Sequence, residues 1–150
     1  MATKFSDIVD VALTTVQDYK LDNIYQTSPD DFATITNAFL LRGLPTFYKC
    51  KTPLTYDLDA GEFTNDLSIF EISILADLWV YQWFEWHVQK VTQFENSMTP
   101  NDFKHHSKAE NLKQKSEYLD RVREKYSQKI TNYCEQTADW TAMANGDFGV

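Results

Sequence analysis

The chain has 150 residues, 43% of them hydrophobic, and a net charge of −8 at pH 7, so it can form one domain with a substantial core. The acidic charge argues against non-specific nucleic-acid binding, which needs Lys and Arg to displace phosphate counterions. No apolar run approaches the roughly 18 residues of a membrane span and no signal-peptide cleavage pattern occurs, so we predict neither membrane insertion nor secretion.

Charge is distributed unevenly along the chain. Residues 1–103 carry 15 acidic and 6 basic side chains, whereas residues 104–150 carry 7 and 8. A polarised surface of this kind can attract further copies of the same protein. A solvated acidic surface without a partner explains the counts equally well, and the sequence leaves both interpretations open.

Two helical patterns occupy the N-terminal part. Apolar residues at helical spacing over residues 5–16 predict one helix that ends near Lys20. The motif "SPDD" at 28–31 predicts the start of a second helix, because serine can cap, proline fits the first position and aspartates suit the positive end of the dipole. Gly43 and Pro45 predict its end, since glycine tolerates a left-handed cap and proline cannot continue the ladder.

A non-helical segment follows at residues 46–66. The alternation of Leu54, Tyr56 and Leu58 predicts an extended loop or a short β-arm near 50–66. Exposed strand edges commonly pair with a neighbouring chain, so these three residues are a candidate protein interface. An irregular loop that lies on its own helices is the alternative.

A third helix is predicted to start at a capping box formed by Ser68 and Glu71. In this motif the serine oxygen accepts a hydrogen bond from the third amide, and the glutamate accepts one from the amide of the cap residue. Apolar residues then cover nearly all sides of the helix from 69 to 81. Such a segment is usually surrounded by other helices or subunits.

The stretch "LADLWVYQWFEW" at 75–86 concentrates aromatic residues within this helix. At 100° per residue, Trp79, Trp83 and Trp86 fall on one narrow stripe. We predict that the stripe packs this helix onto the first and the last helix, inside a rigid body. The alternative is a helical protein-interaction module whose groove is walled by the three tryptophans.

The last helix is predicted to be long. "MTPNDF" at 98–103 has the chemistry of a helix start, and an apolar stripe from Phe103 to Tyr133 continues to about Cys134. This helix is expected to pack antiparallel on the third. The fold class is therefore all-α: a helical bundle with a long antiparallel helical hairpin.

A C-terminal tail, residues 137–150, is predicted to follow the helical domain of residues 1–136. Trp140, Met143 and Phe148 are apolar anchors in an otherwise small and polar segment. We predict that they order against a partner and are interface residues. A frayed chain end is the alternative.

Basic residues of the last helix alternate with acidic ones at spacings that allow pairs within the helix. This pattern favours a solvated helix face over a DNA-binding surface. Arg121 and Arg123 are candidates for contacts with the acidic N-terminal half of another copy.

Motifs for catalysis or cofactor binding do not occur: GxSxG, GxGxxG, P-loop and HExxH patterns are missing. His87 is expected to hydrogen-bond at the edge of the core, and the adjacent His105 and His106 point about 100° apart on a helix, which does not suit one metal. The isolated Cys50 and Cys134 are expected to be free thiols, with a single disulfide as the alternative. We expect no enzyme activity, no cofactor and no metal.

Three motifs within residues 63–133 resemble a known family. They are the capped start "DLSIFEISILADLWVYQW", the helix opening "MTPNDFKHHSKAENLKQ" and the charged helix behind it that ends in tyrosine; the preceding "NAFLLRGLPTFYKCKTPL" also fits. This run resembles the head–tail connector, or adaptor, family of tailed bacteriophages. The tryptophan-rich helix and the segment after Tyr133 depart from that family's pattern.

The resemblance implies a helical protomer that is repeated around the portal axis as a dodecameric ring in the neck of the virion, after synthesis in the host cytoplasm. The ring would lie beneath the portal and join capsid to tail. The implied partners are further copies of the chain, the portal protein and the next neck or tail-terminator protein. DNA would pass through the lumen without sequence-specific binding, and no membrane would be involved.

Overall fold

The computed structural model describes residues 2–97, 102–138 and 144–146, without the side chains of residues 90–97, 102–109 and 111. The all-α prediction is confirmed, with one two-stranded β-hairpin as the only sheet in these residues. The elements are α1 (Phe5–Leu13), α2 (Tyr19–Thr27), α3 (Pro29–Gly43), the 3-10 turn η1 (Leu44–Phe47), β1 (Tyr56–Asp57), β2 (Glu62–Phe63), α4 (Ile69–Ser97) and α5 (Asp102–Thr137).

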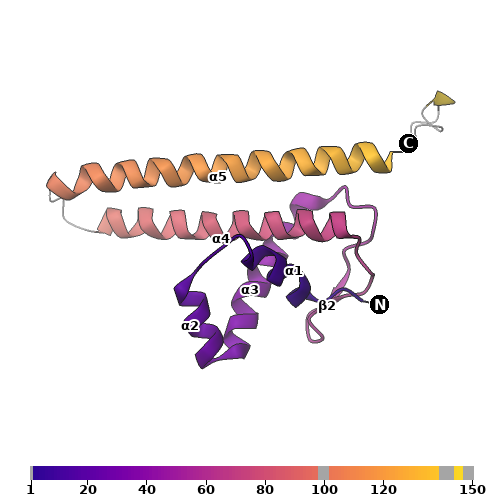
Figure 1. Cartoon of the computed structure of the whole chain (residues 1–150), viewed down its shortest axis with the longest axis horizontal. Coiled ribbons are helices and arrows are strands. Elements are labelled where there is room, and N and C mark those ends of the chain that lie inside the picture. The colour runs from indigo at the N-terminus through magenta and orange to yellow at the C-terminus, as the bar shows by residue number, and fades with distance from the viewer. Residues whose placement is uncertain (1, 98–101, 139–143, 147–150) are drawn as a thin grey trace.

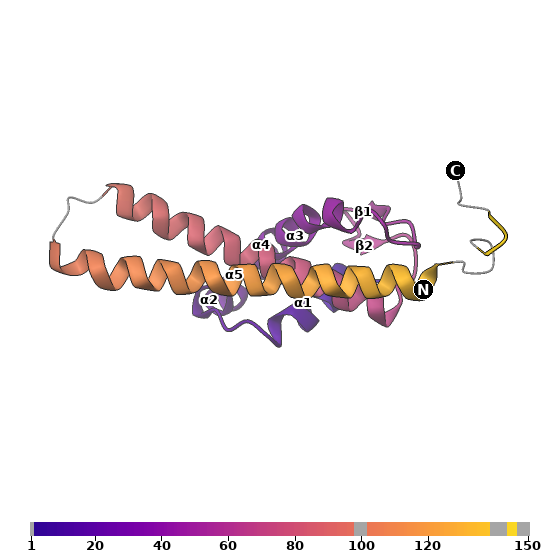
Figure 2. The same ribbon diagram turned by 90° about the horizontal axis from the view of Figure 1, so that it is seen from above.

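The long antiparallel hairpin of α4 and α5 dominates the molecule, as the sequence predicts. Figure 1 shows α1, α2 and α3 gathered on the side of α4 that faces away from α5, with the hairpin projecting beyond them. Figure 2 shows that α4 and α5 diverge toward the C-terminal end of α4 and the N-terminal end of α5. The N-terminal residues, the β-hairpin and the end of α5 lie together at the opposite end.

The prediction of one helix up to Lys20 is wrong. α1 ends at Leu13, and a separate helix, α2, begins at Tyr19. Asp18 starts this second helix, because its Oδ1 accepts a hydrogen bond from the Lys20 N–H over 2.9 Å. Val16 lies in the linker between the two helices and is buried there although it is not helical. Its apolar side chain therefore extended the helical pattern in the sequence beyond the real end of α1.

α3 begins at Pro29, as predicted, with two aspartates in its first turn. The Ser28 side chain makes no capping hydrogen bond, so this part of the prediction is wrong. Gly43 is not a left-handed cap either: its φ is −77°, and the chain continues into η1 with Pro45 in the first turn. A 3-10 turn accommodates this proline because a residue in a first turn needs no N–H partner.

Gly43 is required by close packing rather than by conformation. A Cβ atom at this position would lie 3.0 Å from the Cβ of Leu78, which is buried on α4. A Cβ atom is fixed to the main chain, so neither of these two atoms can move aside unless one of the packed helices moves with it. The glycine therefore sets the distance between α3 and α4.

Replacing Gly43 with alanine is expected to lower the free energy of unfolding by about 1–2 kcal/mol, because overpacking outweighs the gain in helix propensity. Urea denaturation followed by circular dichroism measures the change. Ala38→Gly, at an exposed site of the same helix, is the control. It measures the difference in helix propensity between alanine and glycine without a packing contribution, and it is expected to lower the free energy of unfolding by about 1 kcal/mol. A Gly43→Ala variant that is more stable than the parent would show that α3 and α4 have room to separate.

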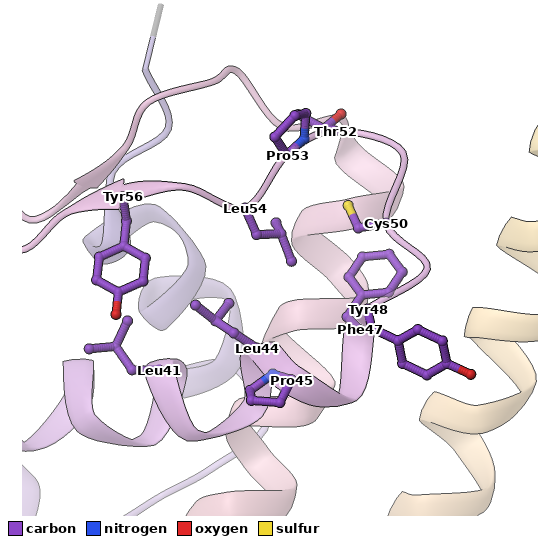
Figure 3. A pocket seen from close by; sticks show the side chains of 10 residues that line it. All are labelled: Leu41, Leu44, Pro45, Phe47, Tyr48, Cys50, Thr52, Pro53, Leu54 and Tyr56. Carbon is purple, nitrogen blue, oxygen red and sulfur yellow. The ribbon is translucent and has the colours of Figure 1, made fainter.

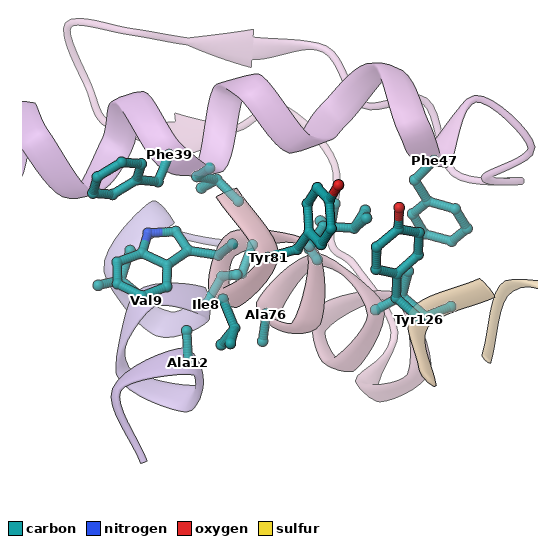
Figure 4. Close-up of a cluster of buried hydrophobic side chains, with 14 of the residues drawn as sticks. Ile8, Val9, Ala12, Phe39, Phe47, Ala76, Tyr81 and Tyr126 are labelled. Carbon is teal, nitrogen blue, oxygen red and sulfur yellow. The ribbon is translucent and has the colours of Figure 1, made fainter. Parts of the chain in front are cut away.

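The core lies where α1 and α3 meet the first half of α4 (Figure 4). Trp79 has no exposed surface; its ring lies edge-on to Phe39 at 5.6 Å, and its Nε1 donates a hydrogen bond to the Thr36 carbonyl over 2.8 Å. Trp86 contacts the same phenylalanine at 5.7 Å. Both rings thus contact α3, a helix that the prediction did not include among the neighbours of the stripe.

α5 packs on a different side of α4. Tyr81 lies edge-on to Tyr126 with ring centroids 5.4 Å apart, and both side chains are buried (Figure 4). The predicted apolar stripe of α5 is confirmed for the described side chains except Ser116, which is exposed; the half-buried or buried members are Leu112, Leu119, Val122, Tyr126, Ile130 and Tyr133. The side chain of the predicted stripe residue Phe103 and the predicted cap at 98–101 lie outside the described part of the chain.

The predicted short β-arm is present as the β-hairpin. Tyr56 of β1 pairs with Phe63 of β2, and the turn is closed by Gly61 at φ 67°, a conformation that favours glycine. On the other side, the Phe63 N–H donates to the Thr3 carbonyl over 2.8 Å, and the Phe5 N–H donates to the Gly61 carbonyl over 2.9 Å. The N-terminal residues therefore cover β2, and β1 is the outer strand.

Candidate protein interface

The outer strand and the hollow beside it form the first candidate interface. The hollow has a volume of about 470 Å³ and lies between the end of α3, η1 and the segment that leads into β1. Figure 3 shows Leu54 and Tyr56 directed from this segment toward Leu41 and Leu44. An outer strand beside an apolar hollow suits an extended segment of another chain, since the strand offers backbone hydrogen bonds and the hollow accepts a side chain.

The predicted interface residues of this arm differ in exposure. Tyr56 is 45% and Leu58 60% exposed, whereas Leu54 is half-buried and packs against the core. The Tyr56 ring also contacts Phe5, with centroids 6.0 Å apart. Tyr48, 78% exposed at the rim of the hollow, was missed because nothing in the sequence pattern distinguishes it from the buried Phe47 beside it.

The outward face of α5 is the second candidate interface. Arg123 is already engaged within the chain: its Nη2 donates to the Tyr81 hydroxyl over 2.8 Å, and its guanidinium lies 5.5 Å from that ring centroid. Arg121 is exposed and lies 5.9 Å from the centroid of Tyr118, itself 37% exposed. Of the two arginines predicted to contact another copy, Arg123 is thus bonded to α4, whereas Arg121 lies over a ring of its own helix.

Arg123→Ala is expected to lower the free energy of unfolding more than the neighbouring Arg121→Ala does, because the hydrogen bond and the cation–π contact with Tyr81 are lost. Arg121→Ala is the matched control, with an expected change within about 0.5 kcal/mol. Chemical denaturation of both variants tests the difference. Equal losses would mean that the Tyr81 contact adds nothing to the stability of the hairpin.

An ion pair also joins the two long helices. Lys129 Nζ lies 2.6 Å from Asp77 Oδ2 and donates to the Ser73 hydroxyl over 2.8 Å. Lys125 Nζ is 3.7 Å from the other oxygen of Asp77. Because the aspartate is largely buried while the lysines are partly exposed, this contact fixes α5 against α4 at the level of the core.

The predicted capping box at the start of α4 is confirmed and extends further. Glu71 Oε2 accepts from the Ser68 N–H over 2.8 Å, and the Glu71 N–H donates to Ser68 Oγ over 3.3 Å. Glu71 Oε1 accepts from the hydroxyls of Thr52 and Tyr133, each over 2.8 Å, and the Tyr133 hydroxyl accepts from the Lys51 N–H over 2.8 Å. One buried carboxylate therefore joins the loop before β1, the start of α4 and the end of α5.

This environment changes the ionisation of three groups. Burial alone would raise the pKa of Glu71, but the hydrogen bonds from Ser68, Tyr133 and Thr52 outweigh it, so the pKa is below its ordinary value. Burial, followed by the Glu71 charge, raises the pKa of Cys50 to about 11, and burial also raises the pKa of Tyr133. Cys50 and Cys134 are both free, as predicted, and the raised pKa of Cys50 favours the protonated thiol at neutral pH.

His87 lies at the edge of the core, as predicted. Its Nε2 is 3.1 Å from Asp18 Oδ2, which also accepts from Trp83 Nε1 over 3.0 Å. Burial would raise the pKa of Asp18, but the hydrogen bonds from Trp83, Lys20 and His87 lower it below the ordinary value. The pair thus ties the α1–α2 linker to α4.

The remaining predicted site residues lie outside the described part: Trp140, Met143 and Phe148 of the tail, and the side chains of His105 and His106. Within the described residues, no three His, Cys, Asp or Glu side chains are placed to hold a metal ion. Over the same residues, no helix combines the length and apolar character needed to cross a membrane. Comparisons of the chain with protein-family models, curated proteins and solved structures give no match.

Proposed function

We propose that the chain is a structural virion protein, a head–tail connector that forms a ring beneath the portal of a tailed bacteriophage and joins capsid to tail. Further copies of the chain, the portal protein and the next neck or tail-terminator protein are its partners. DNA passes through the lumen without sequence-specific contact. The proposal assigns the protein no catalytic role and no cofactor.

The observation that carries the proposal is the correspondence between the family-like run and one structural unit. Residues 63–133 cover the end of the β-hairpin, all of α4 and most of α5. In this unit the polar side chains stiffen the hairpin: Arg123 bonds to Tyr81, and Lys129 pairs with Asp77. A rigid helical hairpin suits a protein that transmits load between two neighbouring rings.

The exposed surfaces support assembly with other chains. The outer strand of the β-arm, with Tyr56 and Leu58, offers an edge for an extended segment of a neighbouring protein. The excess of acidic residues in the N-terminal part and the exposed Arg121 on α5 provide opposite charges for lateral contacts between copies. Several weak contacts repeated around a ring give a durable assembly.

Disruption of the gene in the phage genome that encodes the chain tests the role. We expect DNA-filled heads and separate tails in electron micrographs, with joined particles restored by the intact gene. Complementation with Leu58→Glu is expected to fail, whereas Tyr19→Glu, at an 85% exposed site on α2, is expected to restore joined particles. Normal particles without the gene would refute the connector role.

A helical interaction module is the second candidate, and one observation favours it. A hollow of about 290 Å³ lies between the α1–α2 linker and the hairpin, where Val16, Trp83, Phe84 and Tyr118 contribute to its lining. Trp79 is fully buried and is not part of this lining. If the chain were such a module, Phe84→Glu would abolish capture of a partner and leave head–tail joining intact, the opposite of the result expected for Leu58→Glu.

A further inference from the structure

The outer edge of β1 presents backbone groups at defined positions. The Thr64 N–H donates to the Thr55 carbonyl over 2.9 Å, so Thr55 directs its backbone groups toward β2. Because these groups alternate in direction along an antiparallel strand, those of Leu54 and Tyr56, on either side of Thr55, point away from β2. Among the residues that the structure describes, none bonds to these outward groups. The edge therefore offers donors and acceptors at alternate positions to a further strand.

The side chains of the same two residues make one face of this edge apolar. Leu54 and Tyr56 both point toward the hollow at the end of α3, as Figure 3 shows. Tyr48, at the rim of this hollow of about 470 Å³, is 78% exposed. A strand that pairs with β1 places its opposing side chains on the same face, because directly opposed residues of a ladder lie side by side. The occupant therefore needs apolar side chains at two alternate positions.

The charges at the two ends of the edge have opposite sign. Lys49 and Lys51 precede the extended segment, Asp57 and Asp59 follow its apolar pair, and all four residues are exposed. A strand that enters antiparallel to β1 places its beginning beside the aspartates and its end beside the lysines. The complementary occupant is therefore basic before its apolar residues and acidic after them. The β1 segment of a second copy has this pattern.

We propose that the β1 edges of two copies of the chain pair antiparallel about a two-fold axis, so that the free protein forms a dimer with a continuous sheet. Leu54 of each copy then faces Tyr56 of the other, and each such pair exchanges backbone hydrogen bonds in both directions. The same register brings Lys51 of each copy opposite Asp59 of the other. Each attraction thus occurs twice in the dimer.

Self-pairing satisfies the whole edge with one kind of occupant. It covers the outward donors and acceptors of both copies at once, and it unites the two apolar faces beside the two hollows. The interface closes on itself and leaves the outward face of α5 free for other contacts. The inference goes beyond the connector role and does not depend on it, because the edge, its side chains and its charges are the same for any function.

Sedimentation equilibrium of the full chain over a wide range of protein concentration tests the proposal, and we expect a monomer–dimer equilibrium. Lys51→Glu and Asp59→Lys are each expected to raise the dissociation constant of the dimer by about tenfold or more, because each reversal places like charges together on both sides of the axis. An equimolar mixture of the two variants is expected to dimerise again, since every charge pair between the unlike chains is attractive. Circular dichroism of each variant checks that the helices remain folded.

Tyr56→Pro tests the backbone contact separately from the charges. Proline removes the outward N–H of this residue but no hydrogen bond to β2, because the Tyr56 backbone faces away from that strand. Tyr56→Ala is the matched control, since it also loses the ring contact with Phe5 but keeps the N–H. We expect Tyr56→Pro to dimerise much more weakly than Tyr56→Ala.

The outcomes that contradict the dimer differ from those that contradict the connector role. A chain that stays monomeric at every concentration overturns the dimer and leaves the connector role intact, because that role rests on residues 63–133. An oligomer of any size that is as stable in Tyr56→Pro as in Tyr56→Ala also overturns the proposal, as does a mixture of the charge variants that stays monomeric. Failure of the connector role would appear in phage complementation and would leave the sedimentation result unchanged.

Discussion

Replacing Trp79 with alanine is expected to lower the free energy of unfolding by about 3–5 kcal/mol, the largest effect of any single substitution considered for this chain. The indole is fully buried between α4 and α3, edge-on to Phe39. Its removal leaves a cavity that two packed helices cannot close, and it leaves the Thr36 carbonyl without the N–H that it accepts over 2.8 Å. Urea denaturation followed by far-ultraviolet circular dichroism measures the loss.

Trp79→Phe separates the contribution of apolar packing from that of the hydrogen bond to the Thr36 carbonyl. Phenylalanine retains most of the apolar contact with Phe39 but cannot donate to Thr36, so we expect a smaller loss, about 1–3 kcal/mol. Trp86→Phe, at a half-buried site that contacts the same phenylalanine, is expected to be milder than Trp79→Ala. A Trp79→Ala variant as stable as Trp86→Phe would show that the core at α3 does not depend on this ring.

The hairpin was predictable because its signals are local. The capping box of Ser68 and Glu71 specifies the start of α4 through bonds within one turn, and the apolar stripe of α5 repeats at a helical period over most of its length. The β-arm was one of the two structures that the alternation of Leu54, Tyr56 and Leu58 allowed, and the strand pair that forms lies around Tyr56. Each of these features depends on residues that are near each other in sequence.

Features that depend on distant residues were not predictable. The apolar stripe of the first predicted helix continued to Val16. Asp18 caps a separate helix, α2, and is bonded to Trp83 and His87 of α4, and these contacts show why one continuous helix does not form. The stripe of tryptophans was recognised, but periodicity gives the direction of a face and not the element that covers it. Gly43 was interpreted through its backbone, although its close approach to Leu78 is a tertiary contact.

The same limit applies to the candidate interface. Arg123 and Arg121 are both basic residues on the same helix, and only the structure shows that Arg123 is bonded to Tyr81. Leu54 belonged to the predicted alternation, yet it is half-buried against the core, while Tyr48 at the rim of the hollow carried no pattern. Exposure depends on which segments meet, and a single sequence does not contain that information explicitly.

Glu71→Gln is expected to lower the free energy of unfolding by about 2–3 kcal/mol at neutral pH. Three donors converge on the two carboxylate oxygens: the Ser68 N–H, the Thr52 hydroxyl and the Tyr133 hydroxyl. A glutamine presents an NH₂ group to some of these donors, so at least one hydrogen bond to a charged acceptor is lost in a buried site. Chemical denaturation at pH 7 measures the change.

The cost of Glu71→Gln is expected to shrink as the pH falls below about 4.5, the ordinary value for glutamate. The pKa of Glu71 is lower in the folded chain than in the unfolded chain. Below the ordinary value the unfolded state therefore binds more protons than the folded state, so the free energy of unfolding of the parent decreases as the pH decreases. The glutamine variant cannot lose this contribution. Asp18, whose pKa is also lowered, titrates in both proteins, so the difference between them isolates Glu71.

Glu117→Gln is the matched control for this experiment. Glu117 is exposed on α5, so its substitution is expected to change stability by less than about 0.5 kcal/mol. Tyr133→Phe should reproduce part of the Glu71→Gln loss at pH 7, because it removes one donor to the carboxylate and leaves the Lys51 N–H without its acceptor. Glu71→Gln and the parent could instead lose stability in parallel from pH 7 to pH 3. In that case the acid sensitivity of the fold arises from other carboxyl groups. The junction of the β-arm with the two long helices then does not depend on the Glu71 charge.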